Sequence, residues 1–149
     1  MKRLRYSITI NSPKEKVWKT MLEDATYRIW SEVFMKGSHF TGDWSEGSKM
    51  LFLAPDECGK TFGMVSLIRK NRLYEFISIE HLGFLKDGVE DTTSPEVKAF
   101  AGAQENYTFT EKDRRTEVLV ELDTVEEYAG MFEDTWPRAL EKLKELAEA

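Results

Sequence analysis

Apolar and polar side chains alternate near the start of the sequence. From Leu4 to Ile10 every second residue is apolar, and the residues between them are polar. A period of two residues is typical of a β-strand that buries one face. We therefore expect a half-buried strand over residues 4–10.

A short helix is expected directly after this strand. Ser12 suits the N-cap position, Pro13 suits the first helical position, and Glu15 completes a capping box. Apolar residues then recur four residues apart, which predicts one buried helix face. A second short helix is expected from Asp24. The apolar positions are Val17, Trp18, Met21 and Leu22 in the first helix, and Tyr27, Trp30 and Phe34 in the second.

The pattern becomes strand-like from residue 38 to residue 124. Turn residues divide this region, and short connections between consecutive strands favour an antiparallel meander. The segment 83–103 is rich in Gly, Asp, Thr, Ser and Pro, which predicts a partly ordered flap with one helical turn at 95–100. The expected strands are 50–54, 60–68, 73–81, 107–111 and 116–124, with turns at 42–47, 55–59, 70–72 and 112–115.

The pattern in the last part of the sequence predicts a long C-terminal helix. Its apolar positions recur at steps of three and four residues, opposite a charged face. Pro137 is expected in the first turn or at a kink, because a proline deep in a straight helix costs about 3 kcal/mol. The apolar stripe consists of Phe132, Trp136, Leu140, Leu143 and Ala147.

This order of elements predicts an α+β fold. We expect a curved antiparallel sheet of about six or seven strands, wrapped round the long C-terminal helix, with two short helices after the first strand. A straight helix does not fill a strongly curved sheet, so a cavity between them is the natural ligand site. No internal repeat or linker divides the sequence, and we expect residues 1–149 to form a single domain.

Composition and charge narrow the classes of partner that this protein is expected to bind. The sequence has 149 residues, of which 41% are hydrophobic and 32% charged, with a net charge of −6 and dispersed basic residues. We therefore expect no nucleic acid partner, because phosphate binding depends on clustered Lys and Arg. No apolar segment is long enough for a membrane span or resembles a signal peptide, which predicts a cytoplasmic protein. Cys58 is the only cysteine, so no intrachain disulfide or thiolate metal cluster is expected.

Residues for catalysis or metal binding are sparse. His39 and His81 lie on separate predicted strands, without the converging ligands of a zinc site. His81 shares strand parity with Ile77 and Ile79, and its imidazole points into the cavity if that face of the strand is the concave one. Glu80 would point to the opposite face. The sequence has no nucleophile motif and no phosphate-binding glycine loop. We therefore assign no catalytic residue, no metal site and no cofactor.

Aromatic side chains dominate the expected cavity. They make up 12% of the sequence and lie on elements that flank the gap between sheet and helix. Glu105 and Tyr107 share strand parity with Phe109 and would supply polar anchors, which such pockets use to orient a ligand. The expected lining is Trp30, Phe34, Phe40, Trp44, Met64, Ile79, His81, Tyr107, Phe109, Trp136 and Leu140.

Short motifs along essentially the whole sequence resemble a known superfamily. They are the run from Ser12 to Trp18, Trp30, Gly47-Ser48-Lys49, Gly63-Met64-Val65, Arg72-Leu73, Thr116, and Trp136-Pro137 with Leu140 and Leu143. The sequence thereby resembles the START/SRPBCC (helix-grip, birch-pollen-allergen-like) superfamily, in its activator-of-Hsp90-ATPase-homologue-like branch. The motif residues are mostly structural, and a fold does not fix a function.

The resemblance implies several kinds of function, from which we take three hypotheses. Members of the superfamily are carriers of hydrophobic ligands, hormone receptors, aromatase/cyclases or chaperone partners. Our first hypothesis is a non-catalytic binding or carrier protein for a small lipophilic or aromatic molecule, as a monomer or homodimer. The second is a chaperone-interaction module, and the third is an aromatase/cyclase-like enzyme that uses His81 and Tyr107 as acid and base. The second hypothesis places an exposed apolar patch on the flap, through Phe84, Val89, Val97 and Phe100.

Overall fold

The strands form one curved antiparallel sheet. The computed structural model describes residues 1–149. Its strands are β1 (Lys2–Ile10), β2 (His39–Thr41), β3 (Lys49–Pro55), β4 (Thr61–Arg72), β5 (Phe76–Lys86), β6 (Val89–Asp91), β7 (Gln104–Lys112) and β8 (Arg115–Thr124). They are ordered β1-β8-β7-β5-β4-β3-β2, and β6 pairs with β5. The predicted α+β helix-grip fold is confirmed, and the short strands β2 and β6 bring the sheet to eight strands.

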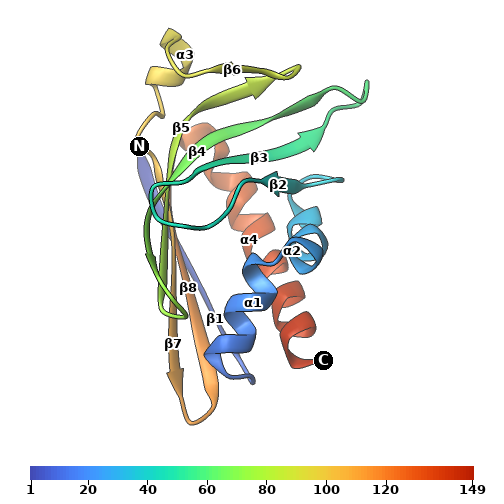
Figure 1. Cartoon of the computed structure of the whole chain (residues 1–149), viewed down its shortest axis with the longest axis vertical. Coiled ribbons are helices and arrows are strands. Elements are labelled where there is room, and N and C mark those ends of the chain that lie inside the picture. The colour runs from blue at the N-terminus through green and yellow to red at the C-terminus, as the bar shows by residue number, and fades with distance from the viewer.

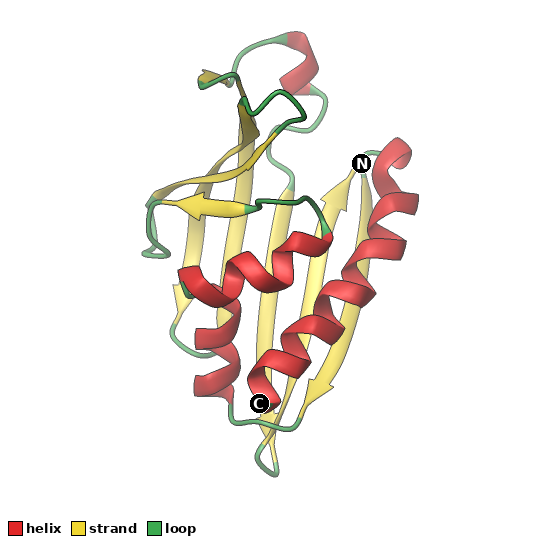
Figure 2. Ribbon diagram, turned by 90° about the vertical axis from the view of Figure 1, so that its right-hand side faces the viewer, coloured by secondary structure: helices red, strands yellow, loops and turns green.

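The main helices lie together on one face of this sheet (Figures 1 and 2). The helical segments are α1 (Lys14–Leu22), α2 (Asp24–Trp30), the 3-10 turn η1 (Ser31–Val33), α3 (Pro95–Lys98) and α4 (Glu126–Glu148). The long helix α4 lies mainly along β1, while α1 and α2 lie beside it. None of the helices combines the length and the apolar character that a membrane crossing requires.

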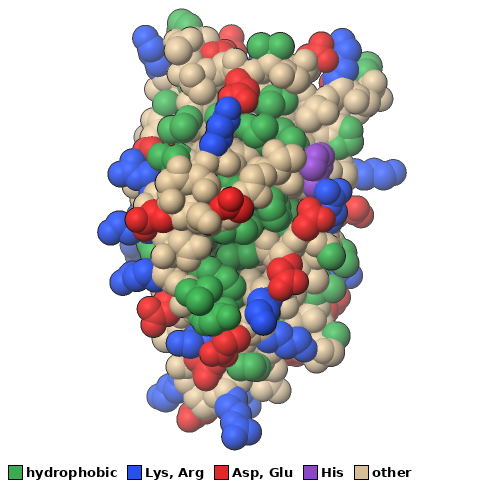
Figure 3. All heavy atoms as spheres, in the orientation of Figure 1, with side chains coloured by type: hydrophobic (Ala, Val, Ile, Leu, Met, Phe, Trp, Pro, Cys, Tyr) green, Lys and Arg blue, Asp and Glu red, His purple; other side chains and the backbone are tan.

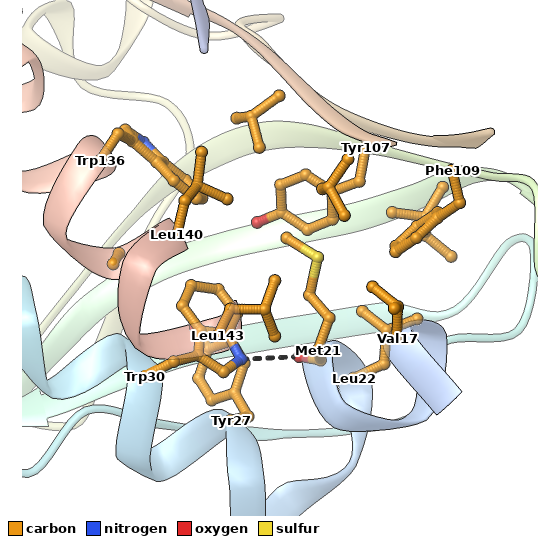
Figure 4. Close-up of a cluster of buried hydrophobic side chains, with 14 of the residues drawn as sticks. Val17, Met21, Leu22, Tyr27, Trp30, Tyr107, Phe109, Trp136, Leu140 and Leu143 are labelled. Carbon is orange, nitrogen blue, oxygen red and sulfur yellow. Dashed lines mark hydrogen bonds between the residues drawn. The ribbon is translucent and has the colours of Figure 1, made fainter. Parts of the chain in front are cut away.

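The core lies between the helices and the inner face of the sheet. On α4, Leu140 and Leu143 are buried, as the periodicity predicts. They face strand residues such as Ile77 and Val120, which have no exposed surface. Figure 4 shows side chains from α1, α2, α4 and β7 meeting in this layer. The helices therefore cover most of the inner face of the sheet where these side chains meet.

The predicted capping box at the first helix is wrong. Helix α1 begins at Lys14, and no side chain caps it locally. Instead, the Lys14 backbone N–H donates to Glu111 Oε1 at 2.7 Å. Ser12 is buried, and its carbonyl accepts a hydrogen bond from Thr116 Oγ1 at 2.8 Å. The cap thus comes from the β7–β8 hairpin, because this helix start is held in a tertiary corner.

The predicted turn at 70–72 is also wrong. Strand β4 continues to Arg72, and the turn lies at residues 73–75, where Tyr74 has φ 65°. The Tyr74 ring contacts Trp18 edge-on, with centroids 6.0 Å apart. This contact fixes the turn at residues 73–75. The residues 70–72, where the turn was expected, form the end of β4 instead.

Pro137 lies in the middle of α4 and not in its first turn. The helix begins at Glu126, directly after β8, so about three turns precede the proline. A proline has no N–H, and the carbonyl of Glu133 therefore lacks its helical donor. Within the expected flap, the single helical turn is confirmed as α3, with Ser94 as its N-cap. The start of the flap differs from the prediction, because β5 continues to Lys86 and turns back into β6 as part of the sheet.

Candidate functional site

Aromatic rings fill most of the space between the sheet and the helices. Trp30 on α2 lies at the centre, with ring centroids 5.0 Å from Tyr27 and 6.0 Å from Trp136. Phe34 lies 4.8 Å from Trp136. We name the whole set the aromatic cluster. Its members are Tyr27, Trp30, Phe34, Phe40, Trp44, Phe52, Tyr107, Phe132 and Trp136.

The expected lining residues fall into two groups. The first group belongs to the buried core and consists of Trp30, Ile79, Tyr107, Phe109, Trp136 and Leu140. The second group is half-buried and consists of Phe34, Phe40, Trp44, Met64 and His81. Phe109 packs against Trp18 at the α1 end, with centroids 5.1 Å apart. The half-buried residues are therefore the ones that a ligand reaches first.

Two of the tryptophans also tie loops and helices to the backbone. Trp30 Nε1 donates to the Met21 carbonyl at 3.0 Å (Figure 4), and Trp44 Nε1 donates to the Leu22 carbonyl at 2.9 Å. Trp136 differs, because its Nε1 is buried and has no hydrogen-bond partner. An indole N–H normally finds a partner when it is buried. Trp136 thus keeps a free donor inside the aromatic cluster.

Four polar side chains are connected across three neighbouring strands. Ser66 Oγ on β4 lies 2.8 Å from His81 Nδ1 on β5. His81 Nε2 lies 3.4 Å from Glu105 Oε1 on β7, and the Tyr107 hydroxyl donates to Glu105 Oε2. We name Ser66, His81, Glu105 and Tyr107 the polar chain. It lies on the inner face, where sequence analysis expected His81, Glu105 and Tyr107.

Ser66 is the member that sequence analysis missed. Between β4 and β5 the register shifts after Val65, so that Val65 pairs with Gly83 and Ser66 pairs with His81. This irregularity leaves an extra residue, Leu82, on β5, and simple alternation does not predict it. A serine within an apolar strand was the available signal, but only the register shows its partner.

Glu105 occupies an apolar row of the sheet. Its register neighbours are Ile79 on β5 and Leu122 on β8, both of which belong to the core. The Glu105 side chain is 21% exposed and the His81 side chain 14%, so solvent or a ligand reaches both. The only ion-pair partner of Glu105 is His81. A carboxylate is therefore held among apolar side chains without a lysine or arginine beside it.

The donors and acceptors available in the polar chain indicate which atom donates in each hydrogen bond. A Ser66 hydroxyl that donates to His81 Nδ1, and a His81 Nε2–H that donates to Glu105, give each atom a partner. With a partner at each ring nitrogen, the orientation of the imidazole is fixed. Ser66 has no exposed surface, and its histidine contact therefore orients the ring and does not present a nucleophile.

Two buried phenols lie within the field of Glu105. Burial, followed by the charge of Glu105, raises the pKa of Tyr107 well above its ordinary value. Burial and the charge of Glu105 also raise the pKa of Tyr27. Both tyrosines remain protonated donors, and neither supplies a phenolate near neutral pH.

These phenols predict a loss of stability in alkali. The unfolded chain releases phenolic protons above about pH 10, whereas the folded protein retains them at Tyr27 and Tyr107. The unfolded state then binds fewer protons, and the free energy of unfolding falls by up to about 1.4 kcal/mol per pH unit for each group. The stability that the two buried phenols contribute is fully present below about pH 10 and is lost as the pH rises above that value.

Urea titrations between pH 8 and pH 11 measure this slope. We expect Tyr27→Phe to give a shallower decline than the wild type. Tyr128→Phe alters a half-exposed ring on α4 and is expected to keep the wild-type slope. Equal slopes for Tyr27→Phe and the wild type contradict the assignment.

Hydrophobic side chains reach the surface where the sheet and the helices meet. Figure 3 shows hydrophobic side chains along the middle of the face on which sheet and helices come together. Two depressions elsewhere are lined mainly by polar or charged side chains. The first contains Val33, Pro137, Arg138, Glu141, Lys142 and Glu145, and the second contains Thr9, Thr110, Lys112, Asp113, Arg115 and Glu117. Neither suits a lipophilic molecule.

The flap does not present the apolar patch of the second hypothesis. Val97 has no exposed surface, and the rings of Phe84 and Phe100 lie 4.6 Å apart and half-buried against each other. Only Val89 of the four is exposed. No group of three or more His, Cys, Asp or Glu side chains is placed to hold a metal ion.

Comparison with known proteins agrees with this fold. The family model described as "Activator of Hsp90 ATPase homolog 1-like protein" matches residues 11–148. The structure of protein MLL2253 from Mesorhizobium loti has 15% identity and a TM-score of 0.71, covering 97% of this chain and 96% of that one. The Aha1 dimer from Colwellia psychrerythraea has 18% identity and a TM-score of 0.70, covering 99% and 97%.

A third structure comes from a biosynthetic locus. DynU16, from the dynemicin locus, has 13% identity and a TM-score of 0.67, covering 99% of this chain and 47% of that one. No curated protein matches the sequence. At these identities the solved structures show the fold alone, while the family model matches nearly the whole chain. The chain belongs to the family of Activator of Hsp90 ATPase homolog 1-like proteins.

Proposed function

We propose that this protein binds a small lipophilic or aromatic molecule between the sheet and α4, without transforming it. The observation that carries the proposal is the polar chain at Glu105. Its carboxylate stands in an apolar row between Ile79 and Leu122. Burying a polar group costs free energy unless it is fully paired, so an aliphatic residue would be the more stable choice there. A few polar groups within an apolar lining are typical of sites that orient a ligand.

The aromatic cluster supplies the apolar part of this site. Phe52 is half-buried and lies near both parts, with ring centroids 5.8 Å from Trp44 and 6.4 Å from the His81 imidazole. The unpartnered Trp136 N–H offers one more donor, which suits an acceptor atom on the ligand. Apolar burial contributes about 25 cal/mol per Å² before the entropic costs of binding.

Entry to the site passes the half-buried rings. Phe34 follows η1 and Phe132 lies on α4, and their ring centroids are 6.5 Å apart. A ligand displaces such rings and takes over their contacts with Trp136. Binding thus requires a more open arrangement of the same side chains. The ligand stabilises this open arrangement because it binds to it more tightly than to the closed one.

Titration with a solvatochromic hydrophobic dye tests the proposal. We expect saturable one-to-one binding to the folded protein. Phe52→Ala is expected to weaken it about tenfold, because it removes a ring that lines the site. Leu73→Ala changes an exposed residue on the distant β4–β5 turn and serves as the control.

Native mass spectrometry of freshly purified protein complements the titration. A co-purified small molecule would occupy the site and must be removed before the dye is added. Absence of saturable dye binding by folded protein that carries no such molecule would overturn the proposed function.

A further inference from the structure

No permanent positive charge pairs with the carboxylate of the polar chain. The only ion-pair partner of the Glu105 carboxylate is His81, and its other contact is the uncharged hydroxyl of Tyr107. No lysine or arginine forms an ion pair with Glu105. A charge removed from water is stabilised when an opposite charge joins it. A positive group on a ligand would therefore supply the permanent opposite charge that the protein does not place at Glu105.

The carboxylate retains free hydrogen-bond capacity. One donor reaches each oxygen, from His81 to Oε1 and from Tyr107 to Oε2. A carboxylate offers about four lone-pair positions, so about two remain for a ligand. An ionised carboxylate has no hydrogen to donate, and the ligand group that completes it is a hydrogen-bond donor.

Aromatic side chains lie near Glu105, and some respond to its charge. Tyr107 donates to it, and its charge raises the pKa of buried Tyr27. The ring of Phe52 lies edge-on to His81. The faces of aromatic rings carry negative electrostatic potential and attract cations by about 0.5–2 kcal/mol. At this site the carboxylate itself carries the preference for a positive group, and the rings supply the apolar surface beside it.

We propose that the ligand is a lipophilic or aromatic amine whose protonated nitrogen binds at Glu105. This inference rests on the proposed function and names the class of ligand. The apolar body of the molecule contacts the aromatic cluster. The ammonium group donates to the free positions of the Glu105 carboxylate and offsets its charge. His81 and Tyr107 hold that carboxylate in place from both sides.

Three naphthalene probes of similar size test the inference. They are 1-naphthylmethylamine, 1-naphthalenemethanol and 1-naphthoic acid, which are positive, neutral and negative at pH 7. Isothermal titration of the wild-type protein is expected to show the amine binding at least about tenfold more tightly than the alcohol. The acid is expected to bind most weakly, because it meets a like charge.

A matched pair of variants assigns the preference to one carboxylate. Glu105→Gln keeps the shape and accepts from Tyr107, and we expect the amine and the alcohol to bind it with similar affinity. Glu117→Gln removes the same charge from an exposed position on β8 and is expected to keep the wild-type ranking. Circular dichroism verifies that each variant is folded.

The outcomes separate this inference from the proposed function. Equal binding of amine and alcohol by the wild type, or tightest binding of the acid, overturns the amine assignment and leaves lipophilic binding intact. A preference for the amine that persists in folded Glu105→Gln also overturns it. Binding of none of the probes, together with a negative dye titration, overturns both. The wild-type ranking is decisive even where a variant does not fold.

Discussion

Trp30→Ala is expected to lower the free energy of unfolding by about 3–5 kcal/mol. The Trp30 side chain is almost completely buried. Its indole joins α1 to α2 through the hydrogen bond to the Met21 carbonyl, and its ring meets Trp136 on α4. Alanine leaves a cavity at the junction of three helices and also leaves the Met21 carbonyl without this partner.

Urea and thermal unfolding measure the loss. For a protein of this size, about 2–4 °C of melting temperature corresponds to 1 kcal/mol, so the midpoint is expected to fall on the order of 10 °C. Trp30→Phe retains an aromatic ring and loses mainly the hydrogen bond, and its loss is expected to be about 1–2 kcal/mol. A change below about 1 kcal/mol for Trp30→Ala would contradict this account of the core.

Gly63→Ala is the second substitution with a large expected effect. Gly63 lies within β4, opposite Leu53 on β3. A Cβ at this position would lie 1.8 Å from the backbone oxygen of Phe52. The obstacle is backbone, so relief requires β3 to move away from β4. We expect a loss of about 3 kcal/mol or more, at the upper end of the cost of overpacking.

Hydrogen exchange locates this damage. Amides of β2 and β3 are expected to lose protection in Gly63→Ala, while those of β1 and β8, at the other edge of the sheet, retain theirs. Gly130→Ala is the control, because Gly130 lies in α4 with open space where its Cβ would stand. That variant is expected to gain about 0.5–1 kcal/mol from helix propensity. Equal stability of the two variants would contradict the role of Gly63.

The fold was predictable because its signals are local and periodic. Alternation marks β1, and the three- and four-residue steps mark the buried stripe of α4, which includes Leu140 and Leu143. The errors arose where a distant contact decides a local boundary. Glu111 replaces the expected cap of α1, and the contact of Tyr74 with Trp18 places the β4–β5 turn.

The candidate site was predictable only in part. Strand parity placed His81, Glu105 and Tyr107 on the inner face, since parity depends on each strand alone. The connection of His81 to Ser66 depends on the register shift within the β4–β5 pair, which no single strand reveals. How far the rings fill the gap depends on rotamers and packing, and composition does not specify these.

The pairing of β1 with β8 has a consequence for the order of folding. Lys2 lies opposite Thr124, so the first strand finds its neighbour more than a hundred residues later. Closing so long a loop carries an entropic cost before any contact compensates for it, and such non-local pairing slows folding. During synthesis, the apolar faces of β1 and α1 emerge from the ribosome before β8 and α4 exist to cover them. The nascent chain thus passes through a stage with exposed apolar surface, in which it is most prone to aggregation.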